Sequence, residues 1–274
     1  MRARRGGVLR RSGHTEAAID FSRLAGFEPA GVIVEIMNED GTMARLPQCR
    51  ELAKKFDLKL VSIADLIEYR LEHETLIERT VETEINTAFG SFKAVAFRQL
   101  TNDIEHLALV KGDWSDEEEV MIRVHSSNLL GDAFQMLDFG KGPKLHSAMK
   151  RIEKEGKGAI IYINKSDSSN GLSKELLAFE KSRKASEASH APMDTKDYGI
   201  GAQILRKLGV SKMKLMSNNP TKRTGLIGYG LEITENVELE IESNKHNELY
   251  LKTKRDKIVF KCPKFRQTIQ WHSQ

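Results

Sequence analysis

Cysteine is scarce in this sequence, and its scarcity excludes several classes of protein. Only Cys49 and Cys262 occur among the 274 residues, too few for a disulfide framework or a four-thiolate metal site. Two unpaired cysteines are typical of a reduced, cytosolic protein. No apolar run approaches the roughly 18 residues of a membrane-spanning helix, and the basic N-terminus lacks the apolar segment of a secretory signal. We therefore expect a cytoplasmic protein with no membrane partner.

Markers of nucleic-acid binding are missing as well. The net charge is only +4, from 43 basic and 39 acidic residues, and the basic excess lies at the two ends of the chain. Basic tails can bind nucleic acid, but no zinc-finger spacing and no aromatic RNA-binding motif accompanies them. We expect no nucleic-acid partner. A hydrophobic share of 39% is ample for one large or two ordinary domains.

The first 74 residues alternate short apolar strands with amphipathic helices. Residues 1–9 resemble the end of a strand, and residues 32–36 and 58–63 have the pattern of buried strands. Helices are expected at residues 47–56 and 64–72, and also after Thr15, which is a plausible N-cap for a helix that Gly26 ends. This order of elements predicts an α/β segment.

Two features of this segment have the chemistry of a site. Ser12 and Gly13 precede a helix, where backbone N–H groups can hold a phosphate, and Arg11 can pair with the same anion. Taken by itself, this stretch also fits a capped helix with an incidental His14. Glu35 lies inside an apolar strand pattern, where a carboxylate is costly unless it is paired, protonated or used in a reaction.

From residue 79 onward the pattern changes to antiparallel β-structure followed by mixed helices and strands. Residues 81–87, 92–98, 106–112 and 120–124 alternate apolar and polar side chains, with turns at 88–90 and 113–119. The expected later elements are helices at 143–155, 171–184 and 198–208, strands at 159–163 and 213–217, a helix from Pro220, strands within 231–242 and a helix at 247–255. The two parts together predict an α+β or α/β protein.

Two motifs follow each other in this segment, Arg11-Ser-Gly-His-Thr-Glu-Ala17 and Val34-Glu-Ile-Met-Asn-Glu-Asp-Gly-Thr-Met-Ala-Arg45. Together they resemble the C-terminal part of 3,4-dihydroxy-2-butanone 4-phosphate synthase. This lyase of riboflavin biosynthesis converts ribulose 5-phosphate into 3,4-dihydroxy-2-butanone 4-phosphate plus formate. The resemblance implies substrate binding by Arg11, Ser12, Gly13, His14 and Thr15. It also implies that His14 is a catalytic ligand of Mg²⁺ (or Mn²⁺), and that Glu35 is a catalytic acid–base group.

The resemblance covers only part of a synthase domain. The long N-terminal portion of the family, with the carboxylates that complete the metal and phosphate site, has no counterpart in this sequence. We therefore expect residues 1–74 to be a truncated synthase segment that is inactive alone. Its substrate in a complete protein would be ribulose 5-phosphate.

A second resemblance covers most of the remaining sequence, and it is to GTP cyclohydrolase II. The matching stretches are Glu105-His-Leu-Ala-Leu-Val-Lys-Gly112, Arg123-Val-His-Ser126, Asp197-Tyr-Gly-Ile-Gly-Ala-Gln-Ile-Leu205, Ser217-Asn-Asn-Pro-Thr-Lys222, Gly225-Leu-Ile-Gly-Tyr-Gly-Leu231 and His246-Asn-Glu-Leu-Tyr-Leu-Lys-Thr-Lys-Arg-Asp-Lys257. The resemblance implies an α+β domain over residues 79–257, a tail over 258–274, and a homodimer. It implies a bifunctional riboflavin-biosynthesis protein.

The zinc site that this family uses is expected to be lost. The family binds zinc through three cysteines, and the anchors around the loop place Asn128, Phe139 and Lys141 at their positions. An amide, a phenyl ring and an ammonium group cannot replace thiolates around zinc. Ser166 and Ser168 likewise replace a Glu and an Arg, Lys144 replaces a Gln, and the Asp-x-Arg pair has become Asp194-Thr-Lys196. We therefore expect an inactive cyclohydrolase domain without zinc.

Some positions that contact the nucleotide in the family keep suitable side chains. These candidates for nucleotide binding are Arg123, His125, Ser126, Asp194, Lys196, Ser217 and Lys222. Two alternatives to the leading hypothesis therefore stay open. One is an active GTP cyclohydrolase II, which would release formate and pyrophosphate from GTP. The other is a non-enzymatic nucleotide-binding, phosphate-binding or dimerisation module, with a basic pocket formed by Arg123, Lys141, Lys144 and Lys222.

Overall fold

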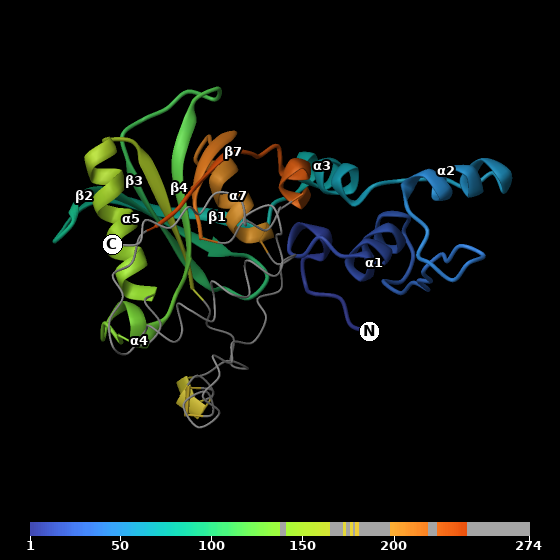
Figure 1. The fold of residues 1–274 in the computed structure, drawn as a ribbon, viewed down its shortest axis with the longest axis horizontal. Coiled ribbons are helices and arrows are strands. Elements are labelled where there is room, and N and C mark those ends of the chain that lie inside the picture. Colours follow the sequence, from blue (N-terminus) through green and yellow to red (C-terminus); the bar gives the residue numbers. More distant parts are fainter. Residues whose placement is uncertain are drawn as a thin grey trace, which may run out of the picture.

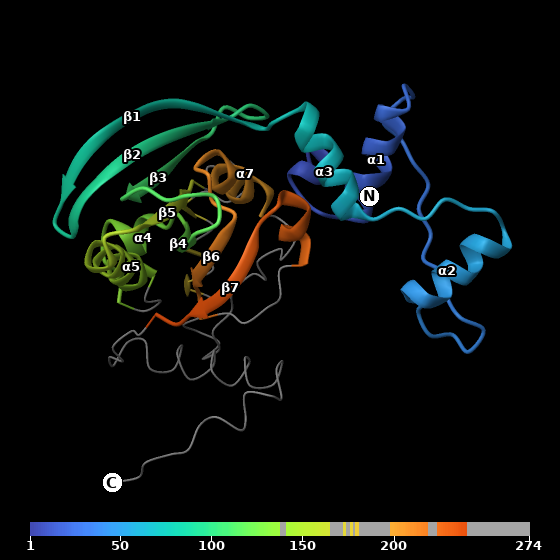
Figure 2. The same cartoon turned by 90° about the horizontal axis from the view of Figure 1, so that it is seen from above.

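The fold is a mixed β-sheet with helices on both faces, preceded by a smaller helical region (Figures 1 and 2). It is known from a computed structural model, which describes residues 1–137, 141–164, 198–218 and 224–239, together with 172–173, 176–177 and 179–180. This combination of a mixed sheet and helices confirms the expected fold class. No helix in the described ranges is both long and apolar enough to cross a membrane.

In the described part of the chain, seven strands form one sheet in the order β1-β2-β3-β5-β4-β6-β7. The strands are β1 (Ile77–Thr87), β2 (Gly90–Gln99), β3 (Glu105–Lys111), β4 (Glu119–Ser126), β5 (Gly158–Ile163), β6 (Lys212–Met216) and β7 (Glu232–Val237). Each overlaps a stretch that the sequence predicted as a strand. β1, β2 and β3 pair antiparallel, as expected, and β5 pairs antiparallel with β3.

The expectation of antiparallel pairing is wrong for β4, which runs parallel to β5 and β6. The reason is the connection between β4 and β5, which contains α4 (Leu129–Asp132) and α5 (Lys141–Glu155). A helical crossover returns the chain to the same end of the sheet, so the next strand is parallel. β6 and β7 are parallel as well. The sheet therefore has a parallel half whose strands end together at Ser126, Ile163, Met216 and Val237.

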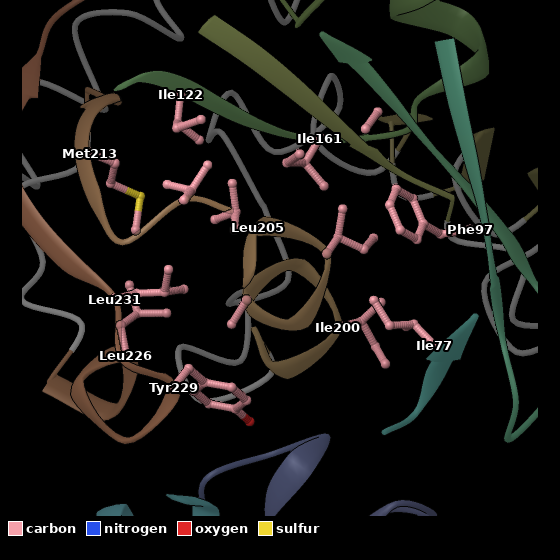
Figure 3. Packing of buried hydrophobic residues seen from close by; sticks show 14 of the residues in the cluster. Ile77, Phe97, Ile122, Ile161, Ile200, Leu205, Met213, Leu226, Tyr229 and Leu231 are labelled. Carbon is pink, nitrogen blue, oxygen red and sulfur yellow. The ribbon is translucent and has the colours of Figure 1, made fainter. Parts of the chain in front are cut away.

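Two helices cover the two faces of the sheet. α5 buries Leu145, Ala148, Met149 and Ile152 against one face, which matches the helix predicted at residues 143–155. α7 (Gly199–Lys207) lies on the other face, and Figure 3 shows Ile200 and Leu205 between the sheet and the turn that carries Leu226 and Tyr229. That turn is the 3-10 helix η3 (Thr224–Tyr229). The helix at 198–208 was predicted correctly.

The N-terminal region consists of η1 (Gly7–Leu9), α1 (His14–Leu24), α2 (Leu46–Lys55) and α3 (Ile63–His73). The three α-helices lie where the sequence predicted them, and Gly26 follows α1 with a positive φ of 80°. Thr15 does not cap α1. Gly13 occupies the N-cap position, and its carbonyl already accepts a hydrogen bond from Ala17 at 2.9 Å.

Three predicted strands of this region do not form. The expected strand end at residues 1–9 is replaced by η1. Residues 32–36 and 58–62 belong to no strand, and Ile63 begins α3. An apolar, β-branched run forms a strand only when a neighbouring strand pairs with it, and the described residues supply no such neighbour. The expected helices at 171–184 and 247–255 and the strand residues beyond 239 lie partly or wholly outside the described residues.

Candidate functional site

The Arg11–Thr15 loop connects η1 to α1 and is held by a buried carboxylate. Arg11 Nη1 donates to Glu16 Oε2 at 2.8 Å, and the backbone N–H of Arg4 donates to Glu16 Oε1 at 3.0 Å. A side chain at Gly13 would collide with Arg11 and Glu16, because its Cβ would lie 2.3 Å from both. Glycine at this position therefore allows the ion pair to form across the loop. Arg11 contributes its charge to the start of α1, where helix N–H groups favour an anion.

The remaining predicted residues of the synthase site are only partly brought together. Ser12 Oγ lies 2.9 Å from the Tyr198 hydroxyl, and His14 is exposed at the start of α1. Glu35 was expected inside a buried strand, and this is wrong, because it lies in a segment that forms no strand and its side chain is exposed. The reason is again the unformed strand at residues 32–36.

The residues present do not fit a magnesium site. Magnesium is bound in proteins chiefly by oxygen ligands in octahedral geometry. The described residues contain no group of three His, Cys, Asp or Glu side chains that could hold a metal ion. His14 is thus a single possible ligand on an exposed helix start.

At the base of the cyclohydrolase-like loop, a buried polar cluster surrounds Asp132. The His125 ring donates from Nε2 to Asp132 at 2.9 Å, and the Tyr162 hydroxyl and the Asn128 backbone N–H both donate to Asp132 Oδ2 at 2.8 Å. Burial raises the pKa of Asp132, but these three hydrogen bonds outweigh burial and hold that pKa below its usual value. Burial together with the bond to Asp132 raises the pKa of Tyr162.

This cluster uses His125 as an internal bridge and not as an open ligand. His125 is 2% exposed and stacks on Tyr162 with ring centroids 5.5 Å apart. Its second nitrogen, Nδ1, is buried and has no hydrogen-bond partner among the described residues. Sequence reasoning singled out His125 but missed Asp132 and Tyr162. The available signal was Asp132 itself, a carboxylate seven residues after His125 in the sequence.

Asn128, which the sequence resemblance assigns to the position of the first zinc ligand, makes a structural hydrogen bond. Its side-chain Oδ1 accepts the backbone N–H of Gly131 at 2.7 Å and so caps α4. Asn128 is 4% exposed, and asparagine is among the preferred N-cap residues. The amide thus satisfies a helix N–H where the family places a thiolate. Several other predicted site residues lie outside the described residues, and their predicted roles stay predictions. These are Phe139, Asp194, Lys196 and Lys222, together with the side chain of Lys141.

Three candidate nucleotide contacts lie at the carboxyl ends of the parallel strands, where open α/β sheets bind ligands. Arg123, near the end of β4, donates from Nη1 to the Met216 carbonyl at 2.7 Å. Ser126 ends β4, and Ser217 follows β6. The Ser217 backbone N–H donates to the Val237 carbonyl at 2.8 Å. The structure therefore brings Arg123 and Ser217 to the same edge of the sheet, and their role in nucleotide binding stays a prediction.

The two regions of the chain meet at η1, directly before the Arg11–Thr15 loop. Gln203 of α7 donates to the Leu9 carbonyl at 2.9 Å and accepts the Leu76 N–H at 2.8 Å. The Tyr229 hydroxyl donates to the Val8 carbonyl at 3.0 Å. The Gly199 N–H donates to the Arg10 carbonyl at 3.3 Å, and a Cβ at Gly199 would lie 2.1 Å from the Leu9 oxygen. Sequence reasoning missed all of these contacts.

A second bridge between the regions runs through a buried histidine. Arg10 Nη1 donates to Gln99 Oε1 at 2.9 Å, and the Asn164 N–H donates to His106 Nδ1 at 3.1 Å. Because Nδ1 accepts, Nε2 carries the proton and faces Gln99 Oε1 at 3.3 Å. Burial and the nearby charge of Arg10 lower the pKa of His106 to about 4. The ring is therefore neutral at physiological pH.

Two known protein families have models that match this chain. The GTP cyclohydrolase II family model matches residues 78–238, which is more than half of the chain. The chain belongs to the GTP cyclohydrolase II family. The 3,4-dihydroxy-2-butanone 4-phosphate synthase family model matches residues 1–69. Both resemblances deduced from sequence motifs are confirmed, in the expected order along the chain.

The relatives that this chain resembles are longer than the chain. The riboflavin biosynthesis protein RibBA of Cytophaga hutchinsonii is 54% identical over 94% of this chain and 65% of that protein. The RibBA protein of Parabacteroides distasonis is 50% identical over the same shares. The crystal structure of RibBX, a two-domain 3,4-dihydroxy-2-butanone 4-phosphate synthase from A. baumannii, is 36% identical, covers 88% of this chain and 62% of that one, and has a TM-score of 0.49. The chain thus spans 65% of the length of these two RibBA relatives.

Proposed function

We propose that this chain acts in riboflavin biosynthesis as the C-terminal part of a 3,4-dihydroxy-2-butanone 4-phosphate synthase fused to a cyclohydrolase domain that has lost its own reaction. In the full-length form the protein converts ribulose 5-phosphate into the four-carbon phosphate plus formate. We propose a cytoplasmic homodimer with the synthase segment at 1–74 and the cyclohydrolase-like domain at 79–257. Both family matches and the RibBA relatives support this assignment.

The observation that carries the proposed loss of cyclohydrolase activity is the hydrogen bond that the Gly131 N–H donates to Asn128 Oδ1. A thiolate at that position would ligate zinc, and zinc would supply the activated water that attacks the guanine ring. An amide already bonded to a helix N–H offers the metal no ligand of comparable strength. With Phe139 and Lys141 at the other two positions, the sequence provides none of the three thiolates. In this proposal, Arg123, Ser126 and Ser217 contact a ligand that the domain does not convert.

Zinc content and GTP turnover test this proposal. We expect the purified chain to contain no stoichiometric zinc by elemental analysis and to release no formate from GTP. The matched control combines Asn128→Cys, Phe139→Cys and Lys141→Cys, which restores three thiolates, and we expect this variant to bind one zinc per chain. Circular dichroism verifies that the variant is folded. Stoichiometric zinc with formate release from the unmodified chain would instead establish an active GTP cyclohydrolase II.

The second candidate function is a nucleotide-binding module at the carboxyl ends of the parallel strands. The position of Arg123 and Ser217 at that edge favours it, because loops at this edge commonly hold phosphates. Calorimetric titration of the chain with GTP and with ribulose 5-phosphate separates the candidates. Heat with GTP and no formate supports a binding module, whereas no heat with either ligand excludes it.

In the proposed function, the cyclohydrolase-like domain retains a structural task for the synthase segment. Gln203, Tyr229 and Gly199 fix the backbone of residues 8–10 by hydrogen bonds. Tyr198 contacts Ser12 inside the predicted substrate loop. Because the loop directly follows the fixed residues, its position depends on α7 and η3. This dependence gives a physical reason for keeping a domain whose metal ligands are gone.

A further inference from the structure

The carboxyl ends of β4, β5 and β6, which we name the ligand edge, are linked to the synthase segment through a buried histidine. Asn164 directly follows β5 at this edge, and its backbone N–H donates to His106 Nδ1 at 3.1 Å. The end of β4 is fixed to the same point, because the Ser127 N–H donates to the Ile163 carbonyl at 2.8 Å. The backbone at the ligand edge is therefore bonded directly to His106.

From His106 the hydrogen bonds continue to Arg10, which directly precedes the predicted substrate loop. His106 Nε2 carries the ring proton and lies 3.3 Å from Gln99 Oε1, which also accepts Arg10 Nη1 at 2.9 Å. The Gln99 amide is held in this orientation, because its Nε2 donates to Thr101 Oγ1 at 2.5 Å. One continuous series of hydrogen bonds, which we name the histidine relay, thus runs from the ligand edge to the loop and consists of Asn164, His106, Gln99 and Arg10.

The histidine relay is buried, and its bonds depend on one another. His106 is 4% exposed and Gln99 is 2% exposed, so a broken bond leaves a polar atom away from water at a cost in free energy. The relay also requires a neutral ring, in which Nδ1 accepts while Nε2 donates. Burial and the charge of Arg10 lower the pKa of His106 and so favour this neutral form. Buried hydrogen bonds in series strengthen one another, and a displacement at one end therefore alters the other.

The first turn of α7 is a second contact between the ligand edge and the synthase segment. The Gly199 N–H donates to the Arg10 carbonyl at 3.3 Å. A Cβ at Gly201 would lie 3.7 Å from the Val124 side chain and 3.9 Å from the Ile163 side chain. This turn therefore packs between Arg10 and the last residues of β4 and β5. The relay crosses a short and closely packed junction.

We propose that the histidine relay transmits the binding of a nucleotide at the ligand edge to the Arg11–Thr15 loop, so that the cyclohydrolase-like domain regulates the synthase segment. This proposal rests on the proposed function, in which the domain contacts a ligand that it does not convert. Connections that follow parallel strands hold phosphates at such an edge, and the connection after β5 begins at Asn164. Binding restrains Asn164, and His106 and Gln99 pass this restraint to Arg10.

Hydrogen exchange with and without GTP tests the relay in the 274-residue chain. Slower exchange at residues 122–127 reports GTP at the ligand edge, and calorimetry gives its affinity. We expect GTP to slow exchange at residues 11–17 by about fivefold or more, the low end of ordinary coupling between two sites. His106→Phe keeps a ring but makes neither hydrogen bond, so GTP should still bind while the response at residues 11–17 disappears. His106→Gln, whose amide both accepts and donates, should retain part of the response.

Arg10→Met breaks the relay at its other end and should also abolish the response at residues 11–17. Arg98→Met is the matched control, because Arg98 lies next to Gln99 on β2 but pairs with Glu78 at the surface. We expect the control to respond to GTP like the unmodified chain. Circular dichroism verifies that each variant is folded. If His106→Phe does not fold, the comparison of Arg10→Met with Arg98→Met decides alone.

Three results would overturn the proposal. They are no heat on titration with GTP, unchanged exchange at residues 11–17 in the unmodified chain with GTP bound, and an equal response in Arg10→Met and Arg98→Met. Formate release, measured in the same samples, separates this proposal from the proposed function. Formate from GTP contradicts the inactive domain whether or not the relay transmits. A failed relay without formate leaves the proposed function standing.

Discussion

At the scale of single residues, His106 makes the stability of the protein depend on pH. Its folded pKa of about 4 lies below the ordinary value of 6.5 because burial and Arg10 disfavour the protonated ring. As the pH falls, the His106 ring therefore becomes protonated near pH 6.5 in the unfolded chain but only near pH 4 in the folded chain. Stability from this residue is complete above pH 6.5 and declines as the pH falls from 6.5 to 4. The total decline is on the order of 3 kcal/mol.

Replacing His106 with Gln removes this titration. We expect the difference in free energy of unfolding between His106→Gln and the unmodified chain to change steadily between pH 6.5 and pH 4.5, in favour of the variant at the lower pH. Urea denaturation at a series of pH values measures it. His73→Gln is the control, because His73 is exposed and bonded only to the Tyr69 carbonyl of its own helix. A constant difference for His106→Gln would contradict the neutral buried ring.

Individual site residues differ in how well the sequence predicts their roles. Motif spacing assigned Asn128 to a zinc-ligand position and Arg123 to a nucleotide contact, and both assignments stay predictions. It did not reveal that Asn128 caps α4, or that Asp132 gathers His125 and Tyr162. Tyr162 is 30 residues from Asp132 in the sequence. Contacts between such distant residues depend on the parallel pairing of β4 and β5, which no local pattern encodes.

At the scale of elements, α7 connects the cyclohydrolase-like sheet to the synthase segment through Gln203. The side chain is 2% exposed, donates to the Leu9 and Gly199 carbonyls, and accepts the Leu76 N–H. Gln203→Leu keeps a similar volume but leaves the Leu9 carbonyl and the Leu76 N–H without this partner. Each buried polar group left unsatisfied costs about 1–3 kcal/mol. We expect the free energy of unfolding to fall by about 2–4 kcal/mol.

Lys207→Met on the same helix is the matched control for Gln203→Leu. Lys207 is exposed at the end of α7, and surface changes of this kind usually alter stability by less than about 0.5 kcal/mol. Hydrogen exchange adds a local readout, because amides of residues 7–10 should lose protection in Gln203→Leu more than those of α5. Equal losses in both variants would show that Gln203 does not hold η1.

The elements differ in how far their own sequence determines them. The helices α1, α2, α3, α5 and α7 were predicted from apolar periodicity and end signals, because a helix satisfies its backbone hydrogen bonds internally. Strands need partners, and this explains why residues 32–36 and 58–63 were predicted as strands but form none. β1 and β2 succeed because the turn at 88–90 joins them directly. The helical connection between β4 and β5 makes these two strands parallel. The alternation of apolar and polar side chains does not determine strand direction.

At the scale of the whole molecule, residues from both family matches share one hydrophobic core. Val8, Leu9 and Ile67 from the synthase segment pack in the same cluster as Ile200 and Tyr229 from the cyclohydrolase-like part. A single continuous core favours cooperative unfolding of the parts that contribute to it. α2 contributes no buried residue to this core. Stability should therefore be shared between α3 and α7 but not with α2.

Leu9→Ala tests this sharing, because Leu9 is fully buried at the junction. Removing a buried Leu side chain costs about 2–5 kcal/mol, and we expect amides of α3 and α7 to lose protection against hydrogen exchange by a similar factor. α2 amides should exchange rapidly in the variant and in the unmodified chain alike. Val81→Ala, at an exposed position on β1, provides the control with little change. Lost protection confined to α1 and α3, with α7 unchanged, would show that the two family segments unfold as independent units, since a shared core cannot weaken on one side only.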